Sequence, residues 1–315
     1  MSDLEKFLAG DLKTLAKFIS KFENYPDERA KLLAQIYPHI KNCWVIGITG
    51  PPGVGKSSLI NALTKSYRKL KQKVGIIVID PSSLVSGGAF LGDRIRMREH
   101  FNDEGVFIRS MATRQSPSGI SEATSGIIKI MDAFGFDPII IESIGVGQSE
   151  AELFDLVHTG ILVQMPGLGD EMQALKAGIL ELSDIIVLNK KDLDSNDAFA
   201  ASLSSWLPED KGGWKPVLIK TQALKEEGIA ELIKMIEEHR QYLRRKYSFE
   251  TLKNQATQKE LELLLKQKIK SHWQKFIHSR KYQQLKAEAS LSLNPYKEVD
   301  LIYKGWLEFG GKSYE

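Results

Sequence analysis

The sequence contains a single cysteine, Cys43, so an intrachain disulfide is excluded. A reducing compartment is the simplest setting for such a composition. Cys43 opens an apolar run, which favours packing over chemistry as its role. The six histidines are scattered between His39 and His278, and the sequence shows no cluster of Cys or His with metal-ligand spacing. The composition therefore gives no sign of a transition-metal site.

Long apolar runs and a strong charge excess are also missing. No stretch approaches the run of about 20 apolar residues that a transmembrane helix requires. The N-terminal segment carries Asp3 and Glu5, which are unusual in a secretory signal or a basic transit peptide. Lys and Arg total 43 against 40 Asp and Glu, and the formal charge of +3 is too small to favour nucleic acid or an anionic membrane as a partner. We therefore expect a cytoplasmic protein that binds neither nucleic acid nor a membrane.

Hydrophobic periodicity divides the 315 residues into three regions. Residues 1–40 predict a helical N-terminal extension. Residues 41–243 alternate strand-like and helix-like segments, which is typical of an α/β fold with a doubly wound, mostly parallel sheet. Residues 244–315 predict a helical arm that packs on the core or joins two subunits, and its aromatic stripe favours the joining role. It opens on the basic run Arg244-Arg245-Lys246, which we interpret as a solvated helix end. The predicted strands are 45–48, 75–79, 106–108, 138–141, 160–163, 184–188 and 216–219, and the predicted helices between them and after the last are 57–71, 93–103, 119–135, 170–182, 197–207 and 226–243.

A glycine-rich loop follows the first predicted strand. The run Gly50-Pro51-Pro52-Gly53-Val54-Gly55-Lys56-Ser57 matches the pattern Gly-x-x-x-x-Gly-Lys-[Ser/Thr] at every fixed position, and an amphipathic helix pattern follows it. In this context backbone N–H groups wrap a polyphosphate, and the helix N-terminus adds partial positive charge. Lys56 is expected to reach the β- and γ-phosphates and Ser57 to ligate Mg²⁺. The sequence therefore predicts a nucleoside-triphosphate site, and a plain glycine turn before a helix is the alternative.

Acidic residues at strand ends are the candidates for the Mg²⁺ shell. Glu142 ends one predicted strand and opens Glu142-Ser143-Ile144-Gly145, which is similar to the Asp-x-x-Gly segment of GTPases. Gly145 would then contact the γ-phosphate. Asp80 ends another strand, and Asp93 lies in the glycine-rich stretch after it. Both carboxylates are suited to bind a metal ion that enters and leaves with the nucleotide. First-turn charge on a helix is an equally good interpretation of Asp93.

A second motif predicts which base is bound. Asn189-Lys190-Lys191-Asp192 matches the Asn-Lys-x-Asp pattern of GTPases. Guanine presents N1–H and N2–H₂ side by side, and a carboxylate such as Asp192 accepts both, whereas adenine has an acceptor at N1. Asn189 is expected to hold the loop and Lys190 to lie along the base, and Ala223 in a later loop is expected to support the base through its backbone N–H. The predicted ligands are therefore GTP and GDP rather than adenine nucleotides.

The residue that orients the attacking water is harder to assign. Ras-like enzymes place a glutamine directly after the switch glycine. That position holds Val146 here, which cannot hydrogen-bond to water. Gln148 is the nearest candidate catalytic residue, and a plain polar loop residue is the alternative interpretation. We therefore expect slow intrinsic GTP hydrolysis that a partner accelerates.

Taken together, these motifs resemble the MeaB/ArgK family of GTPases associated with methylmalonyl-CoA mutase. The most specific part of this resemblance is the run Gly145-Val146-Gly147-Gln148-Ser149-Glu150. The chain departs from the family pattern at Ala177, where a second lysine is common, and in the loop before Ala223, where a serine is missing. The matching segments are Gly50–Ser58, Asp80-Pro81-Ser82-Ser83, Gly92-Asp93-Arg94 with Arg96-Met97, Glu142–Glu150, Gly169-Asp170-Glu171-Met172-Gln173-Ala174-Leu175-Lys176 and Asn189–Asp192.

The resemblance implies a P-loop GTPase fold and a chaperone that binds and hydrolyses GTP. Such a chaperone gates adenosylcobalamin delivery to an acyl-CoA mutase and protects that enzyme. The resemblance also implies a homodimer built through C-terminal helices. By the same match Asp80, Asp93 and Glu142 serve the Mg²⁺ and catalytic shell, and Ser58 belongs to the nucleotide site. Residues 164–177 would form an additional switch, of which the named members are Asp170, Glu171, Gln173 and Lys176.

Three other functions stay open at the level of the sequence. A nickel-insertion GTPase of the same broad architecture would need clustered Cys or His ligands, which the sequence does not show. A transport-linked kinase would transfer phosphate from GTP to a protein acceptor. A nucleotide-gated scaffold without useful hydrolysis is disfavoured by the intact set of metal-binding carboxylates.

Overall fold

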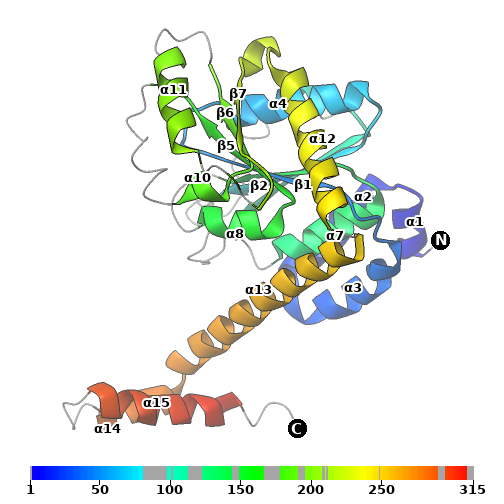
Figure 1. Ribbon diagram of the computed structural model, residues 1–315. Helices are drawn as coiled ribbons and strands as arrows, with labels where there is room; N and C mark the ends of the chain where they lie inside the picture. The colour runs from blue at the N-terminus through cyan, green and yellow to red at the C-terminus, as the bar shows by residue number, and fades with distance from the viewer. Residues whose placement is uncertain are drawn as a thin grey trace. The chain divides into compact units, whose positions relative to one another are not determined.

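The computed structural model describes residues 2–80, 98–100, 102–112, 123–143, 149–166, 178–190, 196–207, 210, 212–247, 249–289 and 295–310. The chain separates into two compact units, Met1–Asn254 and Gln255–Glu315. In the first unit a parallel sheet lies between layers of helices (Figure 1). None of the helices in the described parts of the chain has both the length and the apolar composition that a membrane crossing requires.

The sheet has seven strands in the order β3-β2-β4-β1-β5-β6-β7, and every neighbouring pair is parallel. β-Branched and other apolar residues dominate these segments because both faces of a parallel sheet are covered by helices. All seven predicted strands are confirmed, with ends that differ by a few residues. The strands are β1 (Val45–Thr49), β2 (Val74–Asp80), β3 (Val106–Ala112), β4 (Ile139–Ser143), β5 (Thr159–Gln164), β6 (Ile185–Leu188) and β7 (Val217–Lys220).

Alternation along each strand divides the core between the two faces. Ile46 and Ile48 of β1 share one cluster with the apolar residues of α4 (Lys56–Lys69) and α12 (Ile229–Lys246). Val45 belongs to the cluster on the other face. That second face is covered by α7 (Thr124–Phe134), α8 (Ser149–Leu156), α10 (Ile179–Leu182) and α11 (Asn196–Trp206). The arrangement is the doubly wound fold that the sequence predicts.

The N-terminal helices form an additional layer outside α7 (Figure 1). They are α1 (Asp3–Leu8), α2 (Leu12–Asn24) and α3 (Arg29–Ile36), with 3₁₀ turns at Pro26–Glu28 and Tyr37–His39. Phe7, Leu15 and Ile19 are fully buried in the same cluster as the inner face of α7. The Glu23 carboxylate also pairs with Arg109 of β3. The first three helices are therefore part of the core of the first unit.

A buried carboxylate fixes the chain as it enters β1. Asp132 of α7 accepts hydrogen bonds from the backbone N–H groups of Lys41, Asn42 and Cys43 at 3.1, 3.0 and 3.1 Å. Burial raises the pKa of Asp132 although these donors oppose the shift. Burial also raises the pKa of the Cys43 thiol, which is 5% exposed. Cys43 is thus a packed thiol in the core.

The helices differ more from their predictions than the strands do. Within the predicted N-terminal extension, Gly10, with φ of 90°, separates α1 from α2, and Asp11 caps α2. Helix α8 follows a motif in the sequence and was not predicted. The predicted helices 93–103 and 170–182 fall largely outside the described residues. In the part of the first that is described there is a 3₁₀ turn at Arg98–His100, and in that of the second there is α10.

The second unit is helical and has a small aromatic core. Its helices are the greater part of α13 (Phe249–Ile277), α14 (Arg280–Ala289) and α15 (Pro295–Gly310). Phe276 is fully buried, and its ring centroid lies 5.5 Å from those of Tyr282 and Phe309. Trp273 meets Trp306 edge to face at 5.7 Å. The division after Asn254 lies within α13, whereas the sequence places the start of the arm at residue 244. The three-region assignment stays a prediction.

Candidate functional site

The glycine-rich loop connects the end of β1 to the start of α4. Gly50 and Gly55 have φ of 144° and 96°, which residues with a side chain rarely adopt. At Gly50 a Cβ would also lie 2.2 Å from the carbonyl oxygen of Val163, so only glycine lets the loop pack against β5. The loop turns the backbone tightly onto the N-terminus of α4, which is the arrangement that binds phosphate in proteins.

Lys56 places a positive charge within this loop. The residue is 6% exposed. Its Nζ donates to the carbonyl oxygens of Gly50 at 2.6 Å and Pro51 at 2.9 Å. A buried ammonium group is stable only with oxygen ligands or an anion beside it. The charge of Lys56 therefore adds to the positive end of α4 at the place where the motif predicts a polyphosphate.

Ser57 and Glu142 meet beside the loop. The Ser57 Oγ donates to Glu142 Oε1 over 3.1 Å, although the two residues are 85 positions apart. Glu142 is 4% exposed and lies in register with Ile48 of β1 and Val78 of β2. Parallel strands end at one edge of the sheet, which is why a strand-end carboxylate reaches the first turn of α4.

The chemistry of this corner fits Mg²⁺. Mg²⁺ prefers oxygen ligands and commonly takes one or two from the protein, with waters and phosphate oxygens as the others. The Ser57 hydroxyl and the Glu142 carboxylate are such ligands and lie within hydrogen-bonding distance of one another. β2, the neighbour of β4, ends at Asp80 on the same edge. Among the side chains that the structure describes, no group of three His, Cys, Asp or Glu could hold a metal by itself.

Asn189 joins the predicted base-binding motif to the phosphate loop. It follows β6 and is 3% exposed. Its Nδ2 donates to the Val54 carbonyl at 2.8 Å, and its Oδ1 accepts from the Thr221 hydroxyl and the Ala223 N–H, each at 3.1 Å. A Cβ on Gly55 would lie 2.4 Å from Asn189 Nδ2, so this glycine also makes room for the contact. Three segments thus form one hydrogen-bonded unit.

Two hydroxyl contacts at this edge are not predicted by any motif. Thr221 follows β7 and is fully buried, and its hydroxyl donates a hydrogen bond to Asn189 Oδ1. Ser143 donates to the Thr49 hydroxyl at 3.1 Å, which joins the ends of β4 and β1. The available signal was a small polar residue at the carboxyl end of an apolar run. Such a residue can satisfy strand-end polar groups that water does not reach.

Several predicted site residues have a partial description or none. The Ala223 N–H donates to Asn189 Oδ1, and its contact with a base stays a prediction. Lys190 has φ of 60°, which turns the chain sharply after β6. For Asp80 the structure describes the backbone, which pairs with Ala112 of β3. The predicted residues Asp93, Gly145, Gln148, Asp170, Glu171, Gln173, Lys176 and Asp192 lie outside the described residues.

Comparisons with known proteins agree with this geometry. The family model described as "Methylmalonyl Co-A mutase-associated GTPase MeaB" matches residues 15–277. A putative GTPase of Pyrococcus abyssi is 40% identical over 307 residues, which cover 96% of this chain and 95% of that protein. GTPase ArgK of Escherichia coli is 34% identical over 239 residues, which cover 73% of this chain and 72% of that protein.

A solved structure extends the likeness to three dimensions. The crystal structure of an LAO/AO transport system kinase superposes with a TM-score of 0.74 and 25% sequence identity. The superposition covers 96% of this chain and 95% of that one. The predicted fold, a P-loop GTPase with helical extensions, is confirmed.

Proposed function

Because the chain belongs to the MeaB family of methylmalonyl-CoA mutase-associated GTPases, we propose that it is a chaperone of an adenosylcobalamin-dependent acyl-CoA mutase. The chain is a GTPase, because it belongs to a GTPase family and its relatives bear that name. In the proposed role its nucleotide state gates adenosylcobalamin delivery to the mutase, and its binding protects that enzyme. Methylmalonyl-CoA mutase is the favoured partner because the family description names it.

The observation that carries this proposal is the hydrogen-bonded unit of Asn189, Val54 and Ala223. It ties the base motif to the phosphate loop, as a guanine-nucleotide site requires. In the proposed nucleotide site, Lys56 contacts the β- and γ-phosphates, and the backbone amides of Gly50–Ser58 surround them. Asp192 accepts from guanine N1–H and N2–H₂, and Lys190 lies along the base.

The remaining roles complete the proposed GTPase site. Ser57 and Glu142 would hold Mg²⁺, with Asp80 and Asp93 in its shell. When bound, the ion neutralises charge on the β- and γ-phosphate oxygens. Gly145 contacts the γ-phosphate, and Gln148 orients water. Asp170, Glu171, Gln173 and Lys176 belong to the segment that reports nucleotide state to the mutase.

Guanine selectivity is tested by calorimetry in the presence of Mg²⁺. We expect GDP to bind far more tightly than ADP, because a base-reading carboxylate leaves a buried polar mismatch with adenine. Asp192→Asn should weaken GDP binding and favour xanthosine diphosphate, since the amide can donate to the extra carbonyl of xanthine. Equal affinity for GDP and ADP in the wild-type chain would remove the basis of the proposal.

The mutase partnership is tested by affinity capture from a lysate of the source cells. Immobilised wild-type chain is loaded with GDP or with a non-hydrolysable GTP analogue, and retained proteins are identified by mass spectrometry. Lys56→Ala, which removes the phosphate-loop charge, is the matched control. We expect an acyl-CoA mutase to be retained in a nucleotide-dependent way by the wild type only. A mutase that is absent from every eluate rejects the partnership.

Hydrolysis assays separate the rival functions. With GTP labelled at the γ-phosphate, the proposal predicts slow release of inorganic phosphate and faster release when the captured mutase is added. Transfer of the label to a protein acceptor would indicate a kinase. Tight, stoichiometric Ni²⁺ binding would indicate a metallochaperone.

A further inference from the structure

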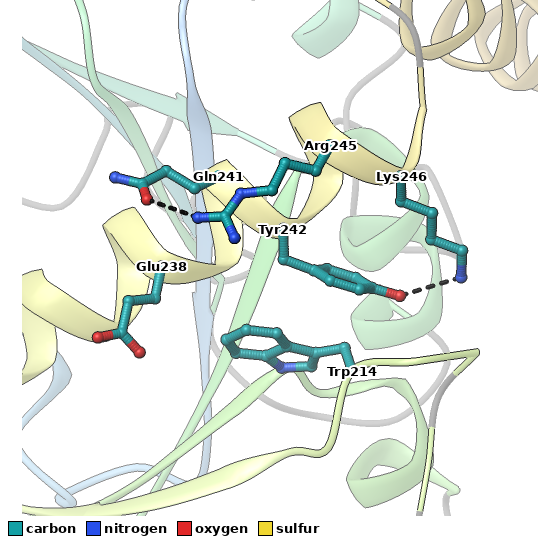
Figure 2. Close-up of a pocket in the computed structure, with 6 residues that line it drawn as sticks. All are labelled: Trp214, Glu238, Gln241, Tyr242, Arg245 and Lys246. Carbon is teal, nitrogen blue, oxygen red and sulfur yellow. Dashed lines mark hydrogen bonds between the residues drawn. The ribbon is translucent and has the colours of Figure 1, made fainter.

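A second candidate site lies on the C-terminal half of α12, away from the nucleotide-binding edge. It is a pocket of about 640 Å³, and Figure 2 shows the side chains around it. Trp214 precedes β7, so the pocket lies at the amino ends of the strands, whereas the glycine-rich loop lies at their carboxyl ends. The pocket is lined by Trp214, Glu238, Gln241, Tyr242, Arg245 and Lys246.

Two aromatic rings form a fixed floor in this pocket. The ring centroids of Trp214 and Tyr242 are 5.4 Å apart, and Trp214 also packs on the buried His239 at 4.6 Å. The Trp214 indole N–H donates to the Asp184 carbonyl at 3.0 Å, and the Tyr242 hydroxyl donates to the Gly212 carbonyl at 2.6 Å. Half-buried Trp and Tyr that are already held in place lose little entropy on binding, and they dominate the energetics of protein interfaces.

Two residues of the basic run, Arg245 and Lys246, line the pocket. Arg244, Arg245 and Lys246 are exposed, and no described carboxylate lies within ion-pair distance of them. Arg245 donates to the neutral Gln241 amide at 3.2 Å, and Lys246 Nζ donates to the Tyr242 hydroxyl at 3.0 Å (Figure 2). The last contact raises the pKa of Lys246, so its charge is retained. Complementing the dipole of α12 explains cations at this helix end, but it does not explain their position beside two fixed rings.

We propose that this pocket is a docking site for an acidic segment of a partner protein. An apolar or aromatic side chain of the segment lies on the Trp214–Tyr242 floor, and its carboxylates pair with Arg245 and Lys246. Arginine with Trp and Tyr is the composition of interface hot spots. The inference is independent of whether the partner is a mutase, and binding here leaves the nucleotide-binding edge of the sheet accessible.

Two other occupants fit the surface less well. A nucleic acid binds through many phosphates spread over a broad basic surface, and the formal charge of the chain is only +3. A small metabolite would be poorly enclosed, because Glu238, Gln241, Arg245 and Lys246 are all exposed, whereas small-molecule sites bury most of the ligand surface. A protein segment needs no such enclosure.

The test uses the full chain and a fluorescein-labelled random copolymer of glutamate and tyrosine as the acidic, aromatic probe. Binding is followed by fluorescence anisotropy for the wild type, for Arg245→Gln/Lys246→Gln and for Trp214→Leu. The matched control is Lys13→Gln/Lys31→Gln, which removes the same charge from exposed positions on the N-terminal helices. We expect saturable binding that each pocket variant weakens by about tenfold or more and that the control leaves within about twofold.

Several results would overturn the proposal. They are absence of saturable binding to the wild type, equal weakening by the control and the double pocket variant, and tighter binding of a single-stranded oligonucleotide than of the copolymer. Thermal unfolding and GDP affinity report whether each variant is folded. We expect both to be unchanged in the two double variants, whereas Trp214→Leu should keep its GDP affinity and unfold at a lower temperature, because it loses the hydrogen bond to Asp184 and the packing on His239. If Trp214→Leu does not fold, the double variant carries the test, because its two side chains are exposed.

Discussion

Asn189 is the residue through which the parts of the nucleotide site are connected. Asn189→Ala would leave the Val54 carbonyl, the Thr221 hydroxyl and the Ala223 N–H without their partner. A buried polar group that loses its hydrogen bond costs about 1–3 kcal/mol. We expect GDP binding to weaken by about tenfold or more and the unfolding midpoint to fall, measured with a fluorescent GDP analogue and by thermal unfolding.

Asn189→Asp is the matched control for that change. Its carboxylate can still accept from Thr221 and Ala223, but it cannot donate to the Val54 carbonyl. If the Val54 contact positions the phosphate loop, the Asp variant will bind GDP poorly and keep more stability than the Ala variant. Wild-type GDP affinity in both variants would contradict the connecting role of Asn189.

His158 gives the stability of the chain a calculable dependence on pH. Its ring stacks on Trp44 with centroids 4.6 Å apart, and its Nδ1 accepts from the Val45 N–H at 3.0 Å. Burial lowers the pKa of His158 from 6.5 to about 4. The unfolded chain binds this proton more readily, so the stabilisation is fully present above pH 6.5 and is lost as the pH falls towards 4.

The size of the effect is testable with one substitution. Between pH 7 and pH 5 the loss from His158 is at most about 2 kcal/mol, at about 1.4 kcal/mol per pH unit below 6.5. His158→Gln does not titrate, and its amide oxygen can accept from Val45. Urea unfolding at the two pH values should therefore show a smaller loss of unfolding free energy in the variant. Equal losses in the variant and the wild type would exclude His158 as the source.

At the residue scale, the sequence predicts candidate site residues where a motif has both the required spacing and the required strand–loop–helix surroundings. Lys56, Ser57 and Glu142 lie at one edge of the sheet, and their roles in binding phosphate and Mg²⁺ stay predictions. The contact between Asn189 and Thr221 spans 32 positions, and finding it requires knowing that β6 and β7 are neighbours. Periodicity within one segment carries no such information, because it reports which face is buried and not what lies against it.

At the scale of elements, the interface between α2 and α7 depends on a glycine. A Cβ on Gly126 would lie 2.0 Å from Phe22 Cζ, and Phe22 is 4% exposed. Gly126→Ala improves helix propensity by about 1 kcal/mol, whereas overpacking a core costs about 1–3 kcal/mol. We expect overpacking to prevail and the free energy of unfolding to fall, as measured by urea denaturation.

The clash is tested by a double-mutant cycle. Combining Gly126→Ala with Phe22→Leu shortens the side chain that the new methyl group meets. We expect the double variant to be more stable than the sum of the single changes predicts, because the two residues are in contact. A stabilised Gly126→Ala single variant would show that Phe22 moves aside at no cost.

The predictability of an element follows from its length and its surroundings. The strands are short apolar runs bounded by turn residues, and each was found. Helix α8 spans only Ser149–Leu156 and follows directly on a motif, so its two turns offer too little periodicity to be recognised. The break between α1 and α2 was predictable in principle, since Asp11 is a good N-cap after Gly10.

At the scale of the whole molecule, the proposed functions divide between opposite edges of one sheet. The carboxyl edge carries the phosphate loop and Asn189. The amino edge carries Trp214, whose indole donates to Asp184 at the entrance to β6, the strand that ends before Asn189. The strands between the two edges are buried on both faces. A partner docked on α12 would therefore contact the chain without covering the nucleotide.

The second unit carries the last prediction, a homodimer formed through the C-terminal helices. Leu261, Leu265 and Ile269 are 64%, 54% and 47% exposed and recur every four residues along α13. Such a row lies on one side of a helix, and covering it with an identical row removes apolar surface from water on both copies. We expect the wild-type chain to sediment as a dimer.

Paired substitutions on α13 test that expectation. Leu265→Gln/Ile269→Gln removes about 0.7–1.5 kcal/mol of apolar burial at each position in each copy, because about half of each side chain is exposed before pairing, so the dissociation constant should rise by well over tenfold. Lys266→Gln/Lys270→Gln, at exposed positions next to the row, is the matched control and should leave the dimer intact. GDP affinity should be the same in both variants, because none of the four residues belongs to the nucleotide-binding motifs. A wild-type chain that is monomeric at micromolar concentration would reject the homodimer. A dimer that survives the loss of both apolar side chains would place the dimer contact elsewhere.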